Sequence, residues 1–152
     1  MSWDDTVGEA LRAAMRAEMP ARYADRLPPG RDEPQMAVTG ENVVWVGLAV
    51  TDDDTAIGHA LLRRHGPDLE IKRMYVVPAR RGHGVATALL DAIDAEALRF
   101  GAPRVILHTG DRQPDAVARY TRHGYRPIPV YEPYVGMPGA HCFAKSPPST
   151  TR

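Results

Sequence analysis

The chain has 152 residues, of which 43% are apolar and 25% are charged, as in an ordinary soluble protein with one hydrophobic core. Its 19 basic and 19 acidic residues cancel, which argues against bulk electrostatic attraction to nucleic acid or an anionic membrane. A single cysteine, Cys142, excludes an internal disulfide and a multi-cysteine zinc site. With no apolar run near the roughly 20 residues of a membrane span and no secretory pattern at the start, we expect a cytoplasmic protein.

The first predicted element is a helix over residues 6–20. Thr6 and Glu9 have the spacing of a capping box, and Pro20 ends the apolar periodicity. Residues 21–41 are rich in proline and charge, which predicts an irregular connection. Aromatic Trp45, further on, is expected to pack in the core.

Three β-rich runs follow, at residues 42–50, 56–64 and 69–77, separated by the turn sequences "TDDDT" and "HGPD". Their short connections predict antiparallel pairing. Strict alternation in the third run defines two faces, one with Leu69, Ile71, Arg73 and Tyr75 and the other with Glu70, Lys72, Met74 and Val76.

The second half alternates helices and strands. We predict a helix over 84–99 capped by Gly101, a strand over 104–109, a second helix beginning near Pro114, an extended segment over 125–131 and a last strand over 140–145. A helical crossover should make strands 69–77 and 104–109 parallel. We therefore expect one α/β (α+β) domain over residues 1–145, with a mixed sheet flanked by helices, and a disordered polar tail over 146–152.

A glycine-containing turn, "ARRGHGVAT", connects the third strand to the long helix. Helix N-termini have unpaired N–H groups and a partial positive charge, and Gly82 and Gly84 would let a phosphate approach the backbone. Arg80 and Arg81 add positive charge, so a pyrophosphate is the natural ligand. A tight turn with surface arginines is the alternative. The sequence lacks the Gly-Lys-Ser/Thr of a Walker loop, and Thr87 stands where a dinucleotide fingerprint needs Gly or Ala.

Two motifs together resemble the GNAT superfamily of acetyl-CoA-dependent N-acetyltransferases. The first is "MYVVP" followed by Arg81, Gly84 and Ala86, as in the family pattern Arg/Gln-x-x-Gly-x-Gly/Ala. The second is "QPDAVARYTRHGY", which matches the family element Asn-x-x-Ala-x-x-x-Tyr-x-x-x-Gly-Phe/Tyr at Ala116, Tyr120, Gly124 and Tyr125, with Gln113 in place of Asn. The resemblance covers roughly residues 43–145.

This resemblance implies a mostly antiparallel sheet of about six to seven strands, with a bulge in strand 69–77 and a splay between it and strand 104–109. Backbone N–H groups of residues 81–87 would hold the CoA pyrophosphate; these residues are Arg81, Gly82, His83, Gly84, Val85, Ala86 and Thr87. Met74, Tyr75 and Val76 would line pantetheine and the acetyl group, with a backbone N–H polarising the thioester carbonyl. Ala116 and Gln113 would also meet the cofactor, although Gln is one methylene longer than the family's Asn.

The reaction implied is direct attack of an amine on the thioester, so Cys142 is interpreted as a packed thiol. Tyr120 resembles the family's general acid for the departing thiolate; packing against Ala116 is the alternative. Glu70 is the first candidate for the general base and His108 the second. Glu70 paired with a neighbour such as Lys72, and His108 as an ordinary strand-end histidine, are the alternatives.

The acceptor is predicted to be a primary amine of a small molecule, bound between residues 6–41 and the segment 131–141. Tyr131, Glu132 and Tyr134 could line that pocket or simply stiffen a surface loop. No metal, nucleic acid or membrane partner is expected, and a homodimer, which is common in the family, stays open. A modifier of aminoacyl-tRNA or protein N-termini, and a non-catalytic CoA-binding module, are the other two functions considered.

Overall fold

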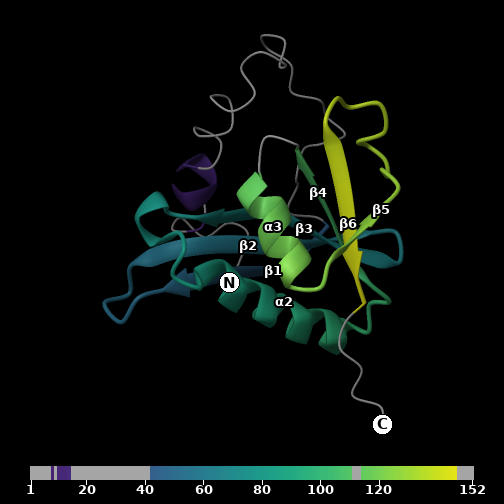
Figure 1. Ribbon diagram of the computed structural model, residues 1–152. Coiled ribbons are helices and arrows are strands. Elements are labelled where there is room, and N and C mark those ends of the chain that lie inside the picture. The colour runs from purple at the N-terminus through teal and green to yellow at the C-terminus, as the bar shows by residue number, and fades with distance from the viewer. Residues whose placement is uncertain (1–7, 9, 15–41, 111–113, 147–152) are drawn as a thin grey trace.

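In this computed structural model we describe residues 8, 10–14, 42–110 and 114–146. Within them, six strands form one sheet (Figure 1). In chain order they are β1 (Val43–Val50), β2 (Ala56–His65), β3 (Asp68–Val76), β4 (Val105–Gly110), β5 (Arg126–Ile128) and β6 (Ala140–Lys145). The spatial order is β1-β2-β3-β4-β6-β5, and only β3 and β4 run parallel. The mixed, mostly antiparallel sheet is confirmed.

The helices also lie where the sequence predicts them. A short 3-10 helix, η2 (Pro78–Arg80), follows β3, and then come α2 (Val85–Phe100) and α3 (Pro114–Arg122). Gly101 ends α2 in the left-handed conformation, with φ of 70°. The predicted extended segment 125–131 was too long, because only Arg126–Ile128 pairs with β6.

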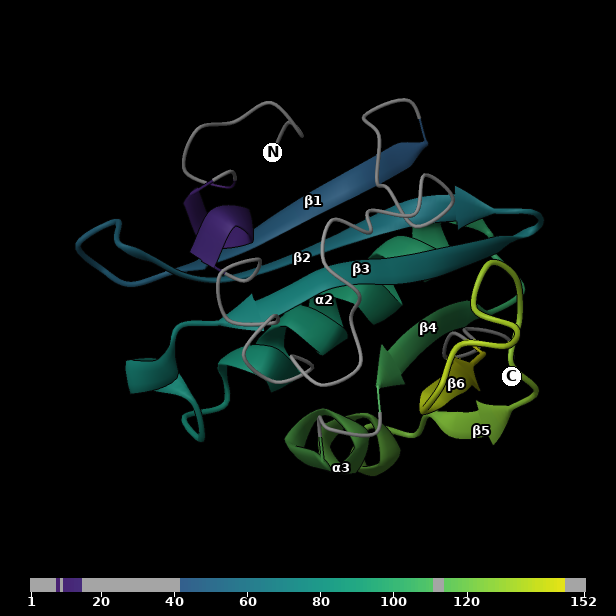
Figure 2. The ribbon, with the colours of Figure 1, turned by 90° about the horizontal axis from the view of Figure 1, so that it is seen from above.

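The long helix α2 packs on the core face of the sheet against β1, β2 and β3. Figure 2 shows α2 running beneath β2 and β3, with α3 lying near the end of β4. The buried face of α2 consists of Leu89, Leu90, Ile93 and Ala97, which recur at helical spacing. Tyr120 of α3 and Phe143 of β6 extend the same cluster, and half-buried Trp45 packs against it.

The parallel pair β3–β4 is short, and this shortness opens the sheet. Only residues 69–71 of β3 pair with residues 105–107 of β4, so Ile71 and Leu107 are the last partners. Beyond them the two strands diverge, as their arrowheads show in Figure 2. The predicted splay is therefore confirmed, and it begins at Lys72 on one strand and His108 on the other.

A β-bulge lies at the same level of β3. The register with β2 shifts between the pairs His59–Tyr75 and Leu61–Lys72, and Arg73 adopts a left-handed φ of 56°. The extra residue reverses the alternation, so Met74 packs against the core that Leu69 and Ile71 also contact. The predicted faces of β3 were therefore wrong beyond Lys72, because simple alternation assumes no bulge.

Buried His59 holds this bulge. Its ring nitrogens lie 3.0 Å from Arg12 Nη1 and 2.8 Å from the Arg73 carbonyl oxygen. A guanidinium can only donate, so Nε2 must accept and Nδ1 must carry the hydrogen that it donates to Arg73. A neutral imidazole with one fixed tautomer thus connects Arg12, in the N-terminal segment, to the bulge of β3.

Residues 8 and 10–14 are helical, and Leu11 and Arg12 are buried. The remaining residues of the predicted helix 6–20, the connection 21–41 and the tail 147–152 lie outside the described residues. Among the described helices, none is long and apolar enough to cross a membrane. A single domain over residues 1–145 stays a prediction.

Candidate active site

The glycine turn presents an open helix N-terminus at the end of β3. Gly82 and Gly84 have φ of 81° and 82°, a conformation that strains any residue with a Cβ, and nothing lies within 4 Å of where their Cβ atoms would be. The Ala88 N–H donates to the Gly84 carbonyl at 3.0 Å. In an α-helix the N–H groups before that point, on residues 85–87, have no intrahelical acceptor. The turn can therefore receive an anion at its backbone.

Arg81 is held against the strand end. Its Nε donates to the Val76 carbonyl at 2.9 Å, and its guanidinium lies 5.4 Å from the Tyr75 ring centroid. Its own N–H donates to the Pro78 carbonyl at 3.3 Å, so this backbone donor is engaged within the turn. Of the seven predicted donors, those of Gly82, His83, Gly84, Val85, Ala86 and Thr87 remain as candidates.

A buried polar cluster around Glu70 lies on the face of the sheet that points away from α2. The Glu70 carboxylate is fully buried and receives three side-chain donors. Arg63 Nε donates to Oε1 at 2.7 Å, while the hydroxyls of Tyr131 and Tyr134 donate to Oε2 at 2.6 and 3.2 Å. Glu70 therefore pairs with a basic residue, which was the alternative to a role as general base. The partner is Arg63 of β2 rather than Lys72.

These donors keep Glu70 ionised. Burial alone would raise its pKa, but the charge of Lys72, the Tyr131 hydrogen bond and Arg63 outweigh burial and lower the pKa below its usual value. The same surroundings raise the pKa of both tyrosine hydroxyls, chiefly through burial and then through the Glu70 charge. Both tyrosines thus stay protonated and serve as donors.

Lys72 and His108 face each other across Tyr134 where β3 and β4 part. Lys72 Nζ donates to the Tyr134 hydroxyl at 2.5 Å, and the His108 ring stacks on the Tyr134 ring, 3.9 Å between centroids and 5° from parallel. Burial lowers the pKa of Lys72 to about 8 although Glu70 opposes the change. A chain of hydrogen bonds therefore runs from Lys72 through Tyr134 to Glu70.

His108 is a neutral imidazole in this setting. Burial, followed by the nearby charge of Lys72, lowers its pKa to about 4. Its Nε2 is buried and has no hydrogen-bond partner among the residues that the structure describes. A buried ring nitrogen with unused hydrogen-bonding capacity beside a strand opening is a candidate contact for a substrate.

Tyr120 lies on the core side of the sheet. It is buried and makes an edge-on contact with Tyr125, with 5.7 Å between ring centroids. Burial raises the pKa of Tyr120 to about 12, so the hydroxyl keeps its proton at neutral pH. Ala116 packs against the same core, Gln113 lies outside the described residues, and Cys142 is a buried thiol, as interpreted from the sequence.

Sequence reasoning missed Arg63 and the central place of Tyr134. Arg63 sits in a β2 run that reads as an exposed strand end, yet its cross-strand register places it opposite Glu70. An arginine and a glutamate seven residues apart around a tight turn are the signal that could have found this pair. Tyr134 was predicted to line the acceptor pocket or to stiffen a surface loop. Its contacts with Glu70, Lys72 and His108 were not predicted, because the packing of segment 131–139 on the sheet carries no local pattern.

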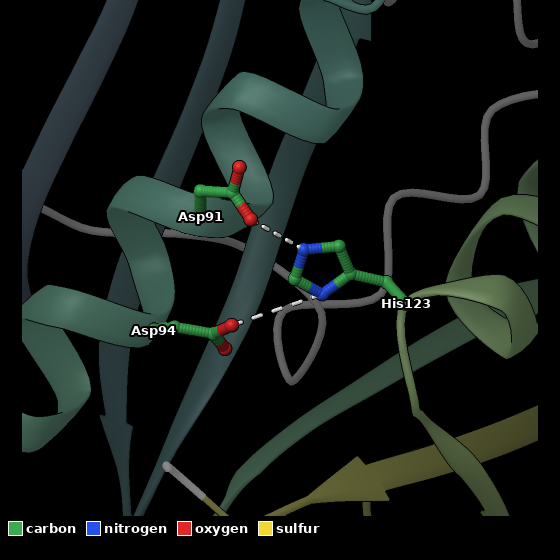
Figure 3. A group of neighbouring side chains, drawn as sticks. All are labelled: Asp91, Asp94 and His123. Atoms are coloured by element: carbon green, nitrogen blue, oxygen red, sulfur yellow. Dashed lines mark hydrogen bonds and ion pairs between the residues drawn. The ribbon is translucent and has the colours of Figure 1, made fainter.

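A second polar cluster lies away from these sites. In Figure 3 the His123 ring lies between Asp91 and Asp94 of α2, and the three ligand atoms are within 4.8 Å of one another. Lys145 Nζ already lies 2.7 Å from Asp94 and 3.2 Å from His123 Nδ1. A lysine ammonium thus balances the half-buried Asp94 carboxylate, and the cluster ties β6 and the end of α3 to α2.

Comparison with known proteins gives the family to which a chain with this fold and these two sites belongs. The model of the acetyltransferase (GNAT) family matches residues 9–125. The chain therefore belongs to the GNAT acetyltransferase family, which confirms the resemblance seen in the sequence.

Curated relatives and solved structures agree. An uncharacterized N-acetyltransferase of Mycobacterium tuberculosis is 31% identical over 107 residues, which are 70% of this chain and 60% of that protein. An "IAA acetyltransferase" of Azospirillum brasilense is 35% identical over 65 residues, 43% of this chain and 42% of that protein. This chain thus spans less than two thirds of these relatives.

Among solved structures, a Klebsiella pneumoniae protein assigned as an acyl-CoA N-acyltransferase superposes with a TM-score of 0.79. It is 26% identical, and the match covers 97% of this chain and 94% of that one. A GNAT acetyltransferase from Elizabethkingia anophelis, solved with acetyl-CoA bound, superposes at 0.58 with 16% identity, over 66% of this chain and 74% of that one. The second likeness supports the fold alone.

The Glu70–Arg63 pair generates a prediction about acid stability. Glu70→Gln should lower the free energy of unfolding at pH 7 by about 3 kcal/mol, because the buried Arg63 loses its carboxylate. A lowered folded-state pKa stabilises the fold above the unfolded pKa of about 4.3, and this contribution is lost as pH falls through the folded pKa. The variant should therefore lose less stability than the wild type between pH 5 and 3.

Urea unfolding at several pH values measures both effects. Arg99→Gln is the control, because it breaks an exposed ion pair with Glu96 and should change the free energy by less than about 0.5 kcal/mol. A Glu70→Gln protein as stable as the control would show that the buried pair contributes nothing.

Proposed function

We propose that the protein is an N-acetyltransferase that moves the acetyl group of acetyl-CoA to a primary amine of a small molecule. The amine attacks the thioester directly while both substrates are bound. The observation that carries this proposal is the opening between β3 and β4, which begins after Ile71 and Leu107, together with the open glycine turn that follows β3. Membership of the GNAT family supplies acetyl-CoA as the cosubstrate.

The backbone of the glycine turn is proposed to bind the CoA pyrophosphate. Residues 82–87 supply N–H donors, and the dipole of the 16-residue helix α2 favours negative charge at this end. Pantetheine would then extend along the unpaired edge of β3 at Met74, Tyr75 and Val76. Because β4 turns away there, the edge of β3 at Met74 and Tyr75 can form strand-like hydrogen bonds, whereas the Val76 carbonyl already accepts one from Arg81.

Tyr120 is proposed to assist the departing thiolate, mainly as a hydrogen-bond donor. With a pKa of about 12, its hydroxyl is always protonated at neutral pH. Complete transfer to a thiolate of ordinary pKa, about 8.5, would be uphill by about 5 kcal/mol. A hydrogen bond to the developing charge avoids that cost, and the thiolate can take its proton from water afterwards.

His108 is proposed as the group that accepts a proton from the attacking amine, in preference to Glu70. Both Glu70 oxygens already receive hydrogen-bond donors from Arg63, Tyr131 and Tyr134, and the carboxylate is fully buried. His108 is neutral, and in the tautomer with hydrogen on Nδ1 its Nε2 offers a free lone pair. Glu70 then acts as a positioning residue that fixes Tyr131 and Tyr134.

A panel of primary amines, assayed for CoA release with the acetylated product confirmed by mass, tests the proposed function. In that assay Tyr120→Phe should lower kcat by about tenfold to a hundredfold, because the thiolate loses a donor. Its Kd for acetyl-CoA should stay within about twofold of the wild type. Wild-type turnover by the variant would remove this role from Tyr120.

The pyrophosphate site is tested by titration with CoA. Gly84→Val should weaken binding by about tenfold or more, because a β-branched residue is strained at φ of 82° and its side chain would occupy the phosphate position. Arg81→Ala should weaken binding much less, since its guanidinium is held at Val76 and Tyr75. Equal losses in the two variants would contradict a backbone-based site.

The base is tested by the pH dependence of His108→Asn. At pH 7 the variant should lose about a hundredfold in kcat/KM, because the amine must then lose its proton to water. The loss should shrink as pH approaches the pKa of the amine, where the free base is abundant. A defect of the same size at every pH would show that His108 has only a structural role.

A further inference from the structure

Lys72 is the unbalanced charge of the buried cluster beside the strand opening. Arg63 and Glu70 form a direct ion pair, with both side chains buried, so their charges cancel. His108, Tyr131 and Tyr134 are neutral for the reasons given above. Among the described residues Lys72 forms no ion pair, and its contacts are the hydroxyl and ring face of Tyr134. The cluster therefore carries one positive charge.

That charge costs free energy because, among the described residues, no carboxylate lies at hydrogen-bond distance from Lys72 Nζ. The Glu70 charge acts on Lys72 only through space and does not outweigh the loss of hydration, since the pKa of Lys72 is lowered. A carboxylate at hydrogen-bond distance would restore that loss far better than a phenol does. Glu70 cannot move to Lys72, since Arg63 holds Oε1 and the two tyrosines hold Oε2. The missing anion must come from outside the cluster.

The position of Lys72 relates this anion to the acceptor. It is the first β3 residue beyond the pairing with β4, as His108 is on β4, so the two side chains flank the mouth of the opening. Lys72 is also partly exposed, whereas Glu70 is not. An anionic group held here would lie on the same face as His108, the proposed proton acceptor.

We propose that Lys72 binds a carboxylate of the acceptor, so that the acceptor is an amine that also carries a carboxylate, such as an amino acid. This inference rests on the proposed function. The carboxylate pairs with Lys72 Nζ and leaves the amine free to point toward the thioester and His108. Binding also neutralises the charge that lowers the pKa of His108, which makes the imidazole a better proton acceptor when the correct substrate is present.

Matched acceptor pairs test the proposal. Each amino acid, including ω-amino acids, is compared with the amine that has hydrogen in place of the carboxylate, as in 4-aminobutanoate against propylamine. The wild type should prefer the carboxylated member by about tenfold or more in kcat/KM. Lys72→Gln should raise KM for that member about tenfold with little change in kcat. It should not lower kcat/KM for the carboxylate-free amine, because loss of the Lys72 charge removes one cause of the lowered His108 pKa. Lys72→Arg, which keeps the charge, should retain much of the preference.

Controls separate this role from folding and from proton transfer. Arg99→Gln removes one positive charge from the surface and should change no preference. Thermal unfolding and CoA titration verify that each variant is folded and binds the cosubstrate. Equal use of both members by the wild type would overturn the proposal, and so would a Lys72→Gln variant that loses kcat equally for both.

Direct binding distinguishes failure of this inference from failure of the proposed function. Saturation-transfer NMR measures binding of the same amino acids and amines to the wild type and to Lys72→Gln in the presence of CoA. Selective binding of carboxylated members by the wild type alone would support the Lys72 site even if no amine were acetylated. If amines were acetylated or bound equally well with and without a carboxylate, the proposed transferase function would stand and the proposed carboxylate site at Lys72 would be overturned.

Discussion

The hydrogen bond from His59 to the Arg73 carbonyl is the interaction on which the rest of the site depends. A left-handed arginine within a strand is unfavourable by about 1–3 kcal/mol and persists only where its surroundings fix it. Buried His59 does so at 2.8 Å, with its tautomer set by Arg12. The bulge rotates the backbone just where pairing with β4 ends. Without it, β3 and β4 could continue side by side, and a thioester would have no place between them.

The two faces of the opened sheet have different chemistry. On the core side, α2 packs against an apolar cluster and presents its N-terminus at the end of β3, where an anion meets backbone donors. On the other side, Glu70 organises a polar cluster through Arg63 and the two tyrosines. The opening that begins at Lys72 and His108 connects these two faces of the sheet. A cosubstrate from one side and an amine from the other can therefore meet there.

The sequence predicted what depends on local pattern. Periodicity located α2 and every strand except β5 to within one residue, and two motifs with fixed spacing indicated the family. Alternation could not predict the faces of β3 beyond Lys72, because a bulge held by a residue 14 positions earlier does not alter the local pattern; only the family resemblance indicated a bulge in this strand. The Glu70 cluster shows the same limit. Its members come from β2, β3 and segment 131–134, and only the folded register brings them together.

The cluster also explains why a carboxylate and a histidine on neighbouring strands have different roles. Glu70 directly precedes Ile71 and lies within the paired part of β3. Its carboxylate accepts hydrogen bonds from Arg63 and the two tyrosines, so its charge is engaged within the fold. His108 lies one residue beyond the paired part of β4 and keeps a nitrogen without a partner among the described residues. Glu70 pairs with Ile106, so two residues of register separate the enclosed carboxylate from His108, the proposed proton acceptor. Since the bulge lies where this pairing ends, the same backbone irregularity that accompanies the opening also coincides with the boundary between these two environments.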